Sequence, residues 1–278
     1  MATGVPGVGE RQADGQPLLA VDNVTLQYKT QDSLVTATWR VGFEVFTSER
    51  FVLLGPSGCG KSTLLKAVAG FMAPVEGAIR LAGRPIDRPG SDRMMVFQEF
   101  DQLLPWKTVL GNVMFPLLVN RVMPRAEAKE HARELLAKVN LTRFEDAFPH
   151  MLSGGMKQRV AIARALAMEP DVLMMDEPFA ALDALTRRKM QEELVALWED
   201  VRFTVLFVTH SIEEALLVGS RILVLSPHPG RVKAELNAHN LGFSDLGTPA
   251  FEELHKRIHN LLFSDKIETE LAPEAAHG

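Results

Sequence analysis

The spacing of hydrophobic and polar positions changes along this chain, and each change predicts a different kind of element. Near the beginning, runs rich in β-branched and aromatic residues are separated by short polar turns, which is typical of β-strands. We predict strands at residues 19–28, 36–46 and 51–54, with turns at 29–33 and 47–50. The first two strands would form a small β layer, and the third is apolar throughout, as expected of a buried strand.

Helical spacing alternates with short apolar runs from residue 154 onward. Such alternation predicts parallel strands joined by crossover helices, and therefore an α/β core. The predicted strands are residues 172–175, 204–208 and 222–225, and the predicted helices are residues 160–168, 184–198 and 212–218.

Two further regions complete the predicted organisation. Between the β layer and the α/β core we expect a helical insertion, with its longer helices at residues 109–119 and 126–139. Near the C-terminus one helix is expected at residues 251–263, before an acidic end without regular structure. The predicted divisions are a disordered tail at residues 1–17, one domain at 18–240 with its helical part inserted at about 98–158, and a short C-terminal helical extension and tail at 241–278.

Composition and charge exclude several functional classes. The chain carries 30 basic and 35 acidic side chains, a net charge of −5, and so lacks the overall positive field that holds a nucleic-acid backbone. Its longest apolar stretches are far shorter than the roughly 20 residues that cross a bilayer. A single cysteine, Cys59, cannot form an internal disulfide, which agrees with a reducing compartment such as the cytoplasm. We therefore expect neither nucleic-acid binding nor a membrane span.

A glycine-rich segment between the third strand and a helix predicted at residues 61–69 carries the strongest chemical signal. It matches the phosphate-loop pattern G-x-x-x-x-G-K-[ST], in which glycines let backbone N–H groups surround phosphate oxygens. Lys61 would add a full positive charge, and Ser62 would place its hydroxyl on Mg²⁺. A glycine turn before an ordinary helix is the alternative, but the pattern and its context both favour nucleotide binding. The predicted nucleotide-binding residues of this segment are Gly55, Pro56, Ser57, Gly58, Cys59, Gly60, Lys61, Ser62 and Thr63.

Polar side chains at the ends of predicted strands indicate the chemistry around this loop. Asp176 ends the apolar run at residues 172–175, where its carboxylate would orient Mg²⁺ directly or through water. Gln98 follows another apolar run, so its amide could contact Mg²⁺ or a water molecule. Tyr28 ends the first strand and could stack its ring on a base. For each of these residues, a purely structural role is the alternative.

Residues 152–159 read Leu-Ser-Gly-Gly-Met-Lys-Gln-Arg and precede an apolar strand that ends in aspartate. Together with the phosphate loop, this segment resembles the signature of the ATP-binding cassette (ABC) ATPases, whose order of motifs is reproduced over about 200 residues. More narrowly, residues 92–98, 103–106 and 152–159 resemble the nitrate, sulfonate and taurine importer ATPases. The chain departs from the family pattern at residues 48–50, where relatives tend to have a Gly-containing turn, and at Met94, where Gly is common.

The resemblance implies an α/β fold, with a P-loop NTPase core of the ABC ATPase type, an antiparallel β subdomain and an α-helical subdomain. It also implies ATP and Mg²⁺ as cofactors, with Ser62, Gln98 and Asp176 around the metal and Tyr28 on adenine. Glu177 would polarise the attacking water as general base, and His210 would hold both the γ-phosphate and Glu177. Gln98 completes the predicted catalytic residues, because in the family its loop senses the nucleotide and the membrane subunit.

The same resemblance implies that one copy of the chain is insufficient. We expect a head-to-tail dimer with a second, identical ATPase subunit, in which Asp183 lies in the loop that crosses between the chains. Two transmembrane permease subunits, and indirectly an extracytoplasmic solute-binding protein, would complete the assembly on the cytoplasmic face of the inner membrane. The residues expected to close over the ATP of the partner are Ser153, Gly154, Gly155 and Gln158.

Three functions therefore compete. The leading one is the ATPase of a membrane importer, for nitrate, sulfonate, taurine or a similar small solute. A soluble ABC ATPase of DNA repair or translation usually carries a coiled-coil or zinc insertion, or two cassettes, whereas only 54 residues separate Gln98 from Ser153 here. A nucleotide-dependent switch with little turnover is disfavoured by the presence of Glu177 and His210.

Overall fold

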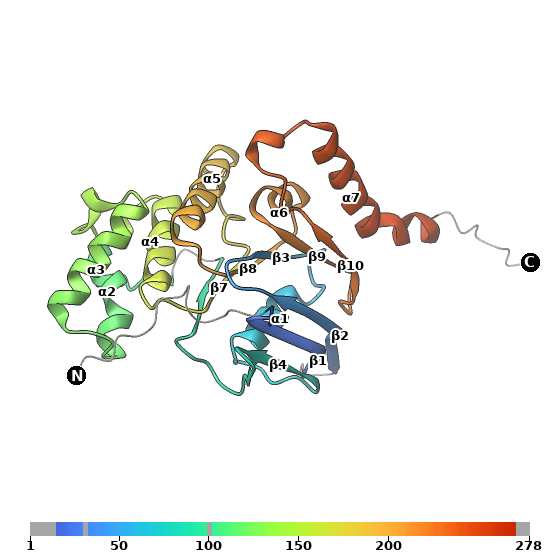
Figure 1. The fold of residues 1–278 in the computed structure, drawn as a ribbon, viewed down its shortest axis with the longest axis horizontal. Helices are drawn as coiled ribbons and strands as arrows, with labels where there is room; N and C mark the ends of the chain where they lie inside the picture. The colour runs from blue at the N-terminus through green and yellow to red at the C-terminus, as the bar shows by residue number, and fades with distance from the viewer. Residues whose placement is uncertain (1–14, 30–32, 99–101, 271–278) are drawn as a thin grey trace, which may run out of the picture.

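The computed structural model of the chain places two β-sheets next to each other and packs helices around them (Figure 1). It describes residues 15–29, 33–98 and 102–270, with side chains up to residue 263. Among these residues, no helix is both long and apolar enough to cross a membrane.

The central sheet has six strands in the order β10-β9-β3-β8-β7-β6. All neighbouring pairs are parallel except β9 and β10, so β10 is an antiparallel strand at one edge. Crossover helices connect the parallel strands, as the alternating sequence pattern predicts. The strands are β3 (Arg50–Leu54), β6 (Arg93–Val96), β7 (Val172–Asp176), β8 (Val205–Thr209), β9 (Arg221–Leu225) and β10 (Val232–Asn237).

Both faces of the central sheet are buried, which is why its strands are continuously apolar. In β7, Val172 and Met174 point into one core, and Leu173 and Met175 point into another. The first core lies against helix α1 (Lys61–Val68) and the second sheet; the second core lies against the remaining helices. Since successive side chains of a strand alternate between its faces, one short apolar run serves both cores.

The smaller sheet is antiparallel, with strands in the order β2-β1-β4-β5. It packs against α1 through a core that includes Leu26, Phe43, Leu64 and Leu65 (Figure 1). Its strands are β1 (Leu19–Lys29), β2 (Leu34–Val45), β4 (Glu76–Leu81) and β5 (Arg84–Pro85).

The helical part lies at one end of the molecule, where α2 and α3 stand beside α4 (Figure 1). Helices α5, α6 and α7 cover the same face of the central sheet as α4, because their buried residues share its core. The helices are α2 (Val109–Val119), α3 (Arg125–Lys138), α4 (Gly154–Leu166), α5 (Ala184–Val201), α6 (Ile212–Val218) and α7 (Pro249–Glu270), and 3₁₀ turns lie at η3 (Thr142–Phe144), η4 (Pro149–Met151) and η5 (Phe243–Asp245).

Several predicted elements need correction. The C-terminal helix does not end at residue 263 but continues to Glu270, so part of the acidic end predicted to lack regular structure is helical. The helix predicted at residues 160–168 begins at Gly154, inside the signature segment. Strands β4, β5 and β10 were not predicted at all. Most of the predicted disordered tail, residues 1–14, lies outside the described residues, and the division at residues 18–240 stays a prediction.

The departure from the family pattern before β3 has a structural counterpart. Ser48 has φ of +60°, a left-handed conformation that glycine adopts without strain and serine does not. Two hydrogen bonds hold it there: its N–H donates to Thr204 Oγ1 at 3.0 Å, and its hydroxyl donates to the carbonyl of Arg202 at 2.7 Å. One hydrogen bond from the backbone and one from the side chain of Ser48 thus stabilise a conformation that glycine would adopt without strain.

Candidate nucleotide site

The predicted phosphate loop connects the end of β3 to the start of α1. Gly58 and Gly60 have φ of +79° and +95°, and the amide of Cys59 donates to the carbonyl of Pro56 at 3.3 Å. A Cβ on Gly60 would lie 2.6 Å from the carbonyl oxygen of Ala37, so only glycine fits. The loop therefore needs glycine at residue 60 for two independent reasons, conformation and close approach to β2.

Lys61 lies inside this loop rather than in solvent, with 4% of its side chain exposed. Its Nζ donates to the carbonyl oxygens of Gly55 at 2.8 Å and Pro56 at 3.0 Å. The same Nζ lies 3.8 Å from Glu177 Oε1. A buried ammonium held only by carbonyls and one carboxylate is well placed to meet phosphate oxygens at the mouth of the loop.

Ser62 and Asp176 meet although they lie far apart in the sequence. Ser62 Oγ donates to Asp176 Oδ1 at 2.9 Å. Burial raises the pKa of the Asp176 carboxyl, because desolvation disfavours its charged form. A nearby divalent cation would reverse that preference, and a hydroxyl beside a carboxylate supplies the hard oxygen donors that Mg²⁺ uses together with phosphates. The pair fits the predicted Mg²⁺ site, whereas nothing in the described residues brings Gln98 into contact with it.

Glu177 and His210 come together at the ends of neighbouring parallel strands. Glu177 directly follows β7, and His210 directly follows β8. Glu177 Oε2 lies 2.9 Å from His210 Nδ1, and the Glu177 amide donates to the carbonyl of Val208 at 3.0 Å. Glu177 has φ of +45°, and its side chain is 18% exposed. The structure thus joins the predicted base to its predicted partner and places the base beside Lys61.

A buried acid that the sequence did not single out supports this strand end. Glu214 accepts hydrogen bonds from Thr209 Oγ1 and from Gln191 Nε2, the latter at 2.9 Å, and burial raises its pKa. Its amide donates to Ser211 Oγ at 3.3 Å. The sequence signal is Ser-x-x-Glu, the capping-box pattern, but here the glutamate side chain turns inward. Glu214 fixes the turn between β8 and α6 on which His210 stands.

The signature residues do not join this cluster. Ser153 is exposed and caps α4, accepting from the amide of Met156 at 3.4 Å. Residues of α4 share a core on one face of the central sheet, whereas α1 packs on the other face. Gly155 is buried against Thr186. Gln158 is fully buried, its Oε1 3.5 Å from Gln102 Nε2, so it does not lie on the exposed surface with Ser153.

Asp183 and Tyr28 are both accessible, in keeping with the predicted roles at a partner and at a base. Asp183 caps α5, accepting from the amide of Thr186 at 3.0 Å; hydrogen bonding from Thr186 lowers its pKa. Tyr28 pairs with Val35 near the end of β1 that leads into β2, and 42% of it is exposed. Neither residue contacts the Lys61 cluster within the described chain, and their ligands remain predictions.

The segment after Gln98, predicted to couple the site to a membrane subunit, is described from residue 102. Buried Asn112 holds its far end: the side chain accepts from the amide of Leu104 at 2.8 Å and donates to the carbonyls of Leu104, Lys107 and Thr108. Trp106, between these bonds, is 71% exposed. A rigid backbone thus presents a large aromatic ring to the outside.

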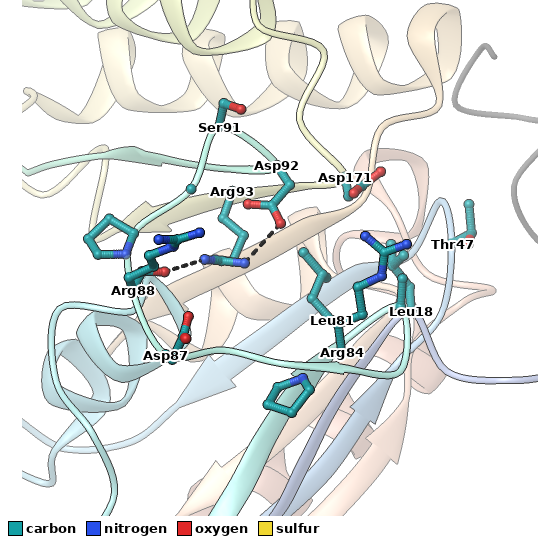
Figure 2. A pocket seen from close by; sticks show the side chains of 14 residues that line it. Leu18, Thr47, Leu81, Arg84, Asp87, Arg88, Ser91, Asp92, Arg93 and Asp171 are labelled. Atoms are coloured by element: carbon teal, nitrogen blue, oxygen red, sulfur yellow. Dashed lines mark hydrogen bonds and ion pairs between the residues drawn. The ribbon is translucent and has the colours of Figure 1, made fainter. Parts of the chain in front are cut away.

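A pocket of about 650 Å³ lies elsewhere, between the β4–β5 hairpin and the loop that leads to β6 (Figure 2). In its wall the Arg93 guanidinium donates to Asp92 Oδ2 at 3.0 Å and to the carbonyl of Arg88 at 2.6 Å (Figure 2). Residues Arg93 and Asp171 stand at the starts of β6 and β7, the opposite edge of the sheet from Glu177. The pocket contains none of the predicted site residues, and the Arg93–Asp92 ion pair braces the connection into β6.

Comparison with known proteins agrees with this geometry. The sequence profile of the ABC transporter family matches residues 39–180. The chain is 48% identical to the taurine import ATP-binding protein of Rhizobium johnstonii, covering 89% of this chain and 97% of that one. It is 48% identical to the bicarbonate transport ATP-binding protein of Synechococcus elongatus, covering 77% of each.

A solved structure is also similar: the dimeric post-hydrolysis state of an ATP-binding cassette bound to ADP and phosphate. It has a TM-score of 0.66 and 33% identity, over 79% of this chain and 98% of that one. The chain belongs to the ABC transporter family of ATP-binding subunits. The predicted P-loop ABC ATPase fold, the ATPase activity and the resemblance to the nitrate, sulfonate and taurine importer group are thereby confirmed.

Proposed function

We propose that this chain is the ATP-hydrolysing subunit of a membrane importer for a small anionic or zwitterionic solute, in the class of taurine, sulfonates, nitrate and bicarbonate. The observation that carries the ATPase part is the convergence of Lys61, Ser62, Asp176, Glu177 and His210 at one edge of the central sheet. The relatives, which are import and transport ATP-binding proteins for taurine and bicarbonate, support the solute class.

Each of these residues has its own role in ATP hydrolysis. Backbone N–H groups of residues 58–62 and the Lys61 ammonium hold the phosphates, and Tyr28 stacks on adenine. Ser62 and Asp176 hold Mg²⁺, which supplies positive charge to the phosphate oxygens when bound. Glu177 orients a water and takes its proton as the water oxygen attacks the γ-phosphorus and the bond to the β-phosphate oxygen breaks. ADP and inorganic phosphate are the products.

His210 keeps the Glu177 carboxylate aimed at that water through their 2.9 Å contact. The imidazole is also half exposed, so a second interaction with the γ-phosphate is open to it. Together these contacts restrict Glu177 to one orientation, which is what a general base requires.

Head-to-tail pairing of two copies completes each site in this proposal. Ser153 and Gly154 open α4 on the exposed surface, where the partial positive charge of the helix N-terminus suits the γ-phosphate of a partner. The dimeric form of the similar cassette supports this arrangement. Since both copies hold the same phosphate, its removal abolishes the differential stabilisation of the closed dimer.

Permease subunits would dock on the helical part, at the cytoplasmic face of the membrane. Trp106 is exposed, and its chain neighbour Lys107 lines a groove of about 260 Å³ together with Met114, Phe115 and Val119. Asn112 ties the loop that carries Trp106 to α2. A push on this ring would therefore reach α2, to which Asn112 ties the loop.

The test is the ATPase rate of the chain alone and after co-expression with candidate permease subunits, with Lys61→Ala as the control for contaminating ATPase. We expect the rate to rise when permease subunits co-purify and to vanish with Lys61→Ala. If permease subunits do not change the ATPase rate and the chain instead fractionates with ribosomes or DNA, the family assignment stands but the transport role is refuted.

A further inference from the structure

The turn between β9 and β10, residues 226–231, lies against both the phosphate loop and β2. The amide of Gly230 donates to the carbonyl of Ala37 at 2.9 Å, and the amide of Trp39 donates to the carbonyl of Gly230 at 2.9 Å. Gly230 therefore forms a parallel bridge with Thr38. None of the predicted motifs includes this turn.

The contact between Gly230 and the phosphate loop leaves no room for a side chain. A Cβ on Gly230 would lie 2.1 Å from the carbonyl oxygen of Cys59, far inside any real contact distance. Gly60 is also too close to β2 for a side chain, since its Cβ would lie 2.6 Å from the carbonyl oxygen of Ala37. Three backbones thus meet here, and no flexible side-chain end can give way.

The turn that carries Gly230 is itself held firmly. Ser226 Oγ accepts from the amide of Arg231 at 3.0 Å and lies 3.2 Å from the carbonyl oxygen of Pro229 as a donor. The backbone of Ser226 also donates to the carbonyl of Arg231 at 2.8 Å. Because hydrogen bonds join its first and last residues, the turn is rigid enough to hold the phosphate loop in position.

We propose that Gly230 is a positioning residue for ATP, because it sets the orientation of the peptide between Cys59 and Gly60. The carbonyl that Gly230 touches belongs to the same peptide as the Gly60 N–H, so moving one reorients the other. That N–H is one of the groups expected to face the phosphates. The inference rests on the proposed placement of ATP in this loop, and it adds a turn from outside the loop to the machinery that aligns it.

The test compares Gly230→Ala with Gly242→Ala, a matched glycine whose Cβ would meet only an Asp245 carboxylate oxygen at 3.9 Å. ATP affinity is measured with a fluorescent nucleotide, beside the thermal unfolding of each nucleotide-free variant. We expect Gly230→Ala to weaken ATP binding about 10-fold or more, the effect of one misaligned charge-assisted hydrogen bond, while Gly242→Ala stays near wild type.

The labelling rate of Cys59, the single cysteine, reports on the local structure of the phosphate loop. Cys59 is fully buried, and burial raises its pKa, so a thiol reagent should label the native wild-type protein slowly. Gly230→Ala should raise the labelling rate of folded protein several-fold, because it displaces the Cys59 peptide, and Gly242→Ala should not. If Gly230→Ala only destabilised the whole fold, the unfolding temperature would fall but the labelling rate of Cys59 in folded protein would not rise.

If Gly230→Ala does not fold, Ser226→Ala decides the matter, because it loosens the turn without adding bulk. It should weaken ATP binding by a few-fold and speed Cys59 labelling. Unchanged affinity and labelling in a folded variant of either residue would overturn the proposal. Lys61→Ala distinguishes failure of the proposed ATP site from failure of the role of Gly230. If Lys61→Ala also binds ATP normally, ATP does not bind in this loop. If Lys61→Ala loses ATP binding and the Gly230 and Ser226 variants do not, only the role of Gly230 is refuted.

Discussion

The phosphate-loop region and the signature region both place glycines at the start of a helix, but their surroundings differ. At the first, Lys61 at the start of α1 converges with Asp176 and Glu177 at the end of β7 and with His210 at the end of β8. At the second, Ser153 caps α4 and faces outward, and the described part of the chain brings no acid or imidazole to its hydroxyl. In the proposed function, the first region aligns the reacting groups within one chain, and the second acts on the ATP of a second molecule.

The largest expected effect comes from removing the base in the first region. Glu177→Gln should lower turnover about 100-fold or more, the usual contribution of a general base, and leave ATP affinity unchanged. Because ATP then persists, the variant should accumulate as a closed dimer. Steady-state ATPase, nucleotide titration and gel filtration with ATP measure the three properties. Turnover close to wild type would remove Glu177 from the base role.

The second expected effect tests whether the two regions act across chains. Lys61→Ala spoils one phosphate loop, and Ser153→Glu places negative charge where the phosphate of a partner should dock. Each variant alone should be nearly inactive. A mixed dimer with one chain of each kind contains one site with both halves intact, so its ATPase should rise several-fold above either homodimer.

Two different affinity tags would isolate the mixed dimer, and ATPase assays at equal protein concentration would compare it with each homodimer. The control is a mixed dimer in which one chain carries both Lys61→Ala and Ser153→Glu and the other is wild type. Each of its two sites then has one damaged half, so its activity should stay low. Equal activity in both mixtures would mean that the signature does not serve its neighbour.

A third prediction concerns the loop that faces the membrane subunits. Asn112→Ala removes four hydrogen bonds to the backbone of residues 104–108 and should destabilise the fold by about 2–3 kcal/mol. ATP affinity should stay near wild type, because Asn112 is remote from the phosphate loop, whereas stimulation by permease subunits should fall. Denaturant unfolding and ATPase assays with and without permeases distinguish the effects. Undiminished stimulation would argue against coupling through this loop.

The smallest expected effect is a pH dependence of stability caused by Glu214, the buried acid that fixes the turn carrying His210. The pKa of Glu214 is raised above its ordinary value of 4.5 by burial, so folding favours the protonated carboxyl. Its contribution to stability is therefore present below the unfolded-state pKa and is lost as pH rises through the folded-state pKa. Glu214→Gln, which imitates the neutral acid, should gain stability relative to wild type as pH rises. Denaturant unfolding at several pH values measures this difference, and a parallel pH response in both proteins would contradict it.

Much of the first region could be predicted because its residues follow simple local patterns. Apolar runs end in Asp176 and in Thr209, so the parallel strand ends that meet at the site were visible in the sequence. Helices α2 and α6 begin and end where the periodicity placed them. The resemblance to the ABC ATPases then supplied roles for residues that patterns alone leave open, such as His210.

What could not be predicted depends on contacts between distant segments. Strand β10 is an exception: Val232, Ala234 and Leu236 alternate with polar residues, so this short edge strand could have been predicted from the sequence. Nothing local distinguishes Gly230 from an ordinary turn glycine, because its constraint comes from Cys59 on another loop. The inward rotation of Gln158 was missed for the same reason, since the signature pattern does not show which side of α4 faces Gln102.

The backbone of Glu177, with its φ of +45°, has a consequence for attempts to make this protein more heat-resistant. A non-glycine residue in that conformation costs about 1–2 kcal/mol, so Glu177→Gly should relieve conformational strain at the same position that carries the base. A selection for thermal survival alone would therefore favour an inactive enzyme, and thermostabilisation of this cassette has to be screened by turnover as well as by melting temperature.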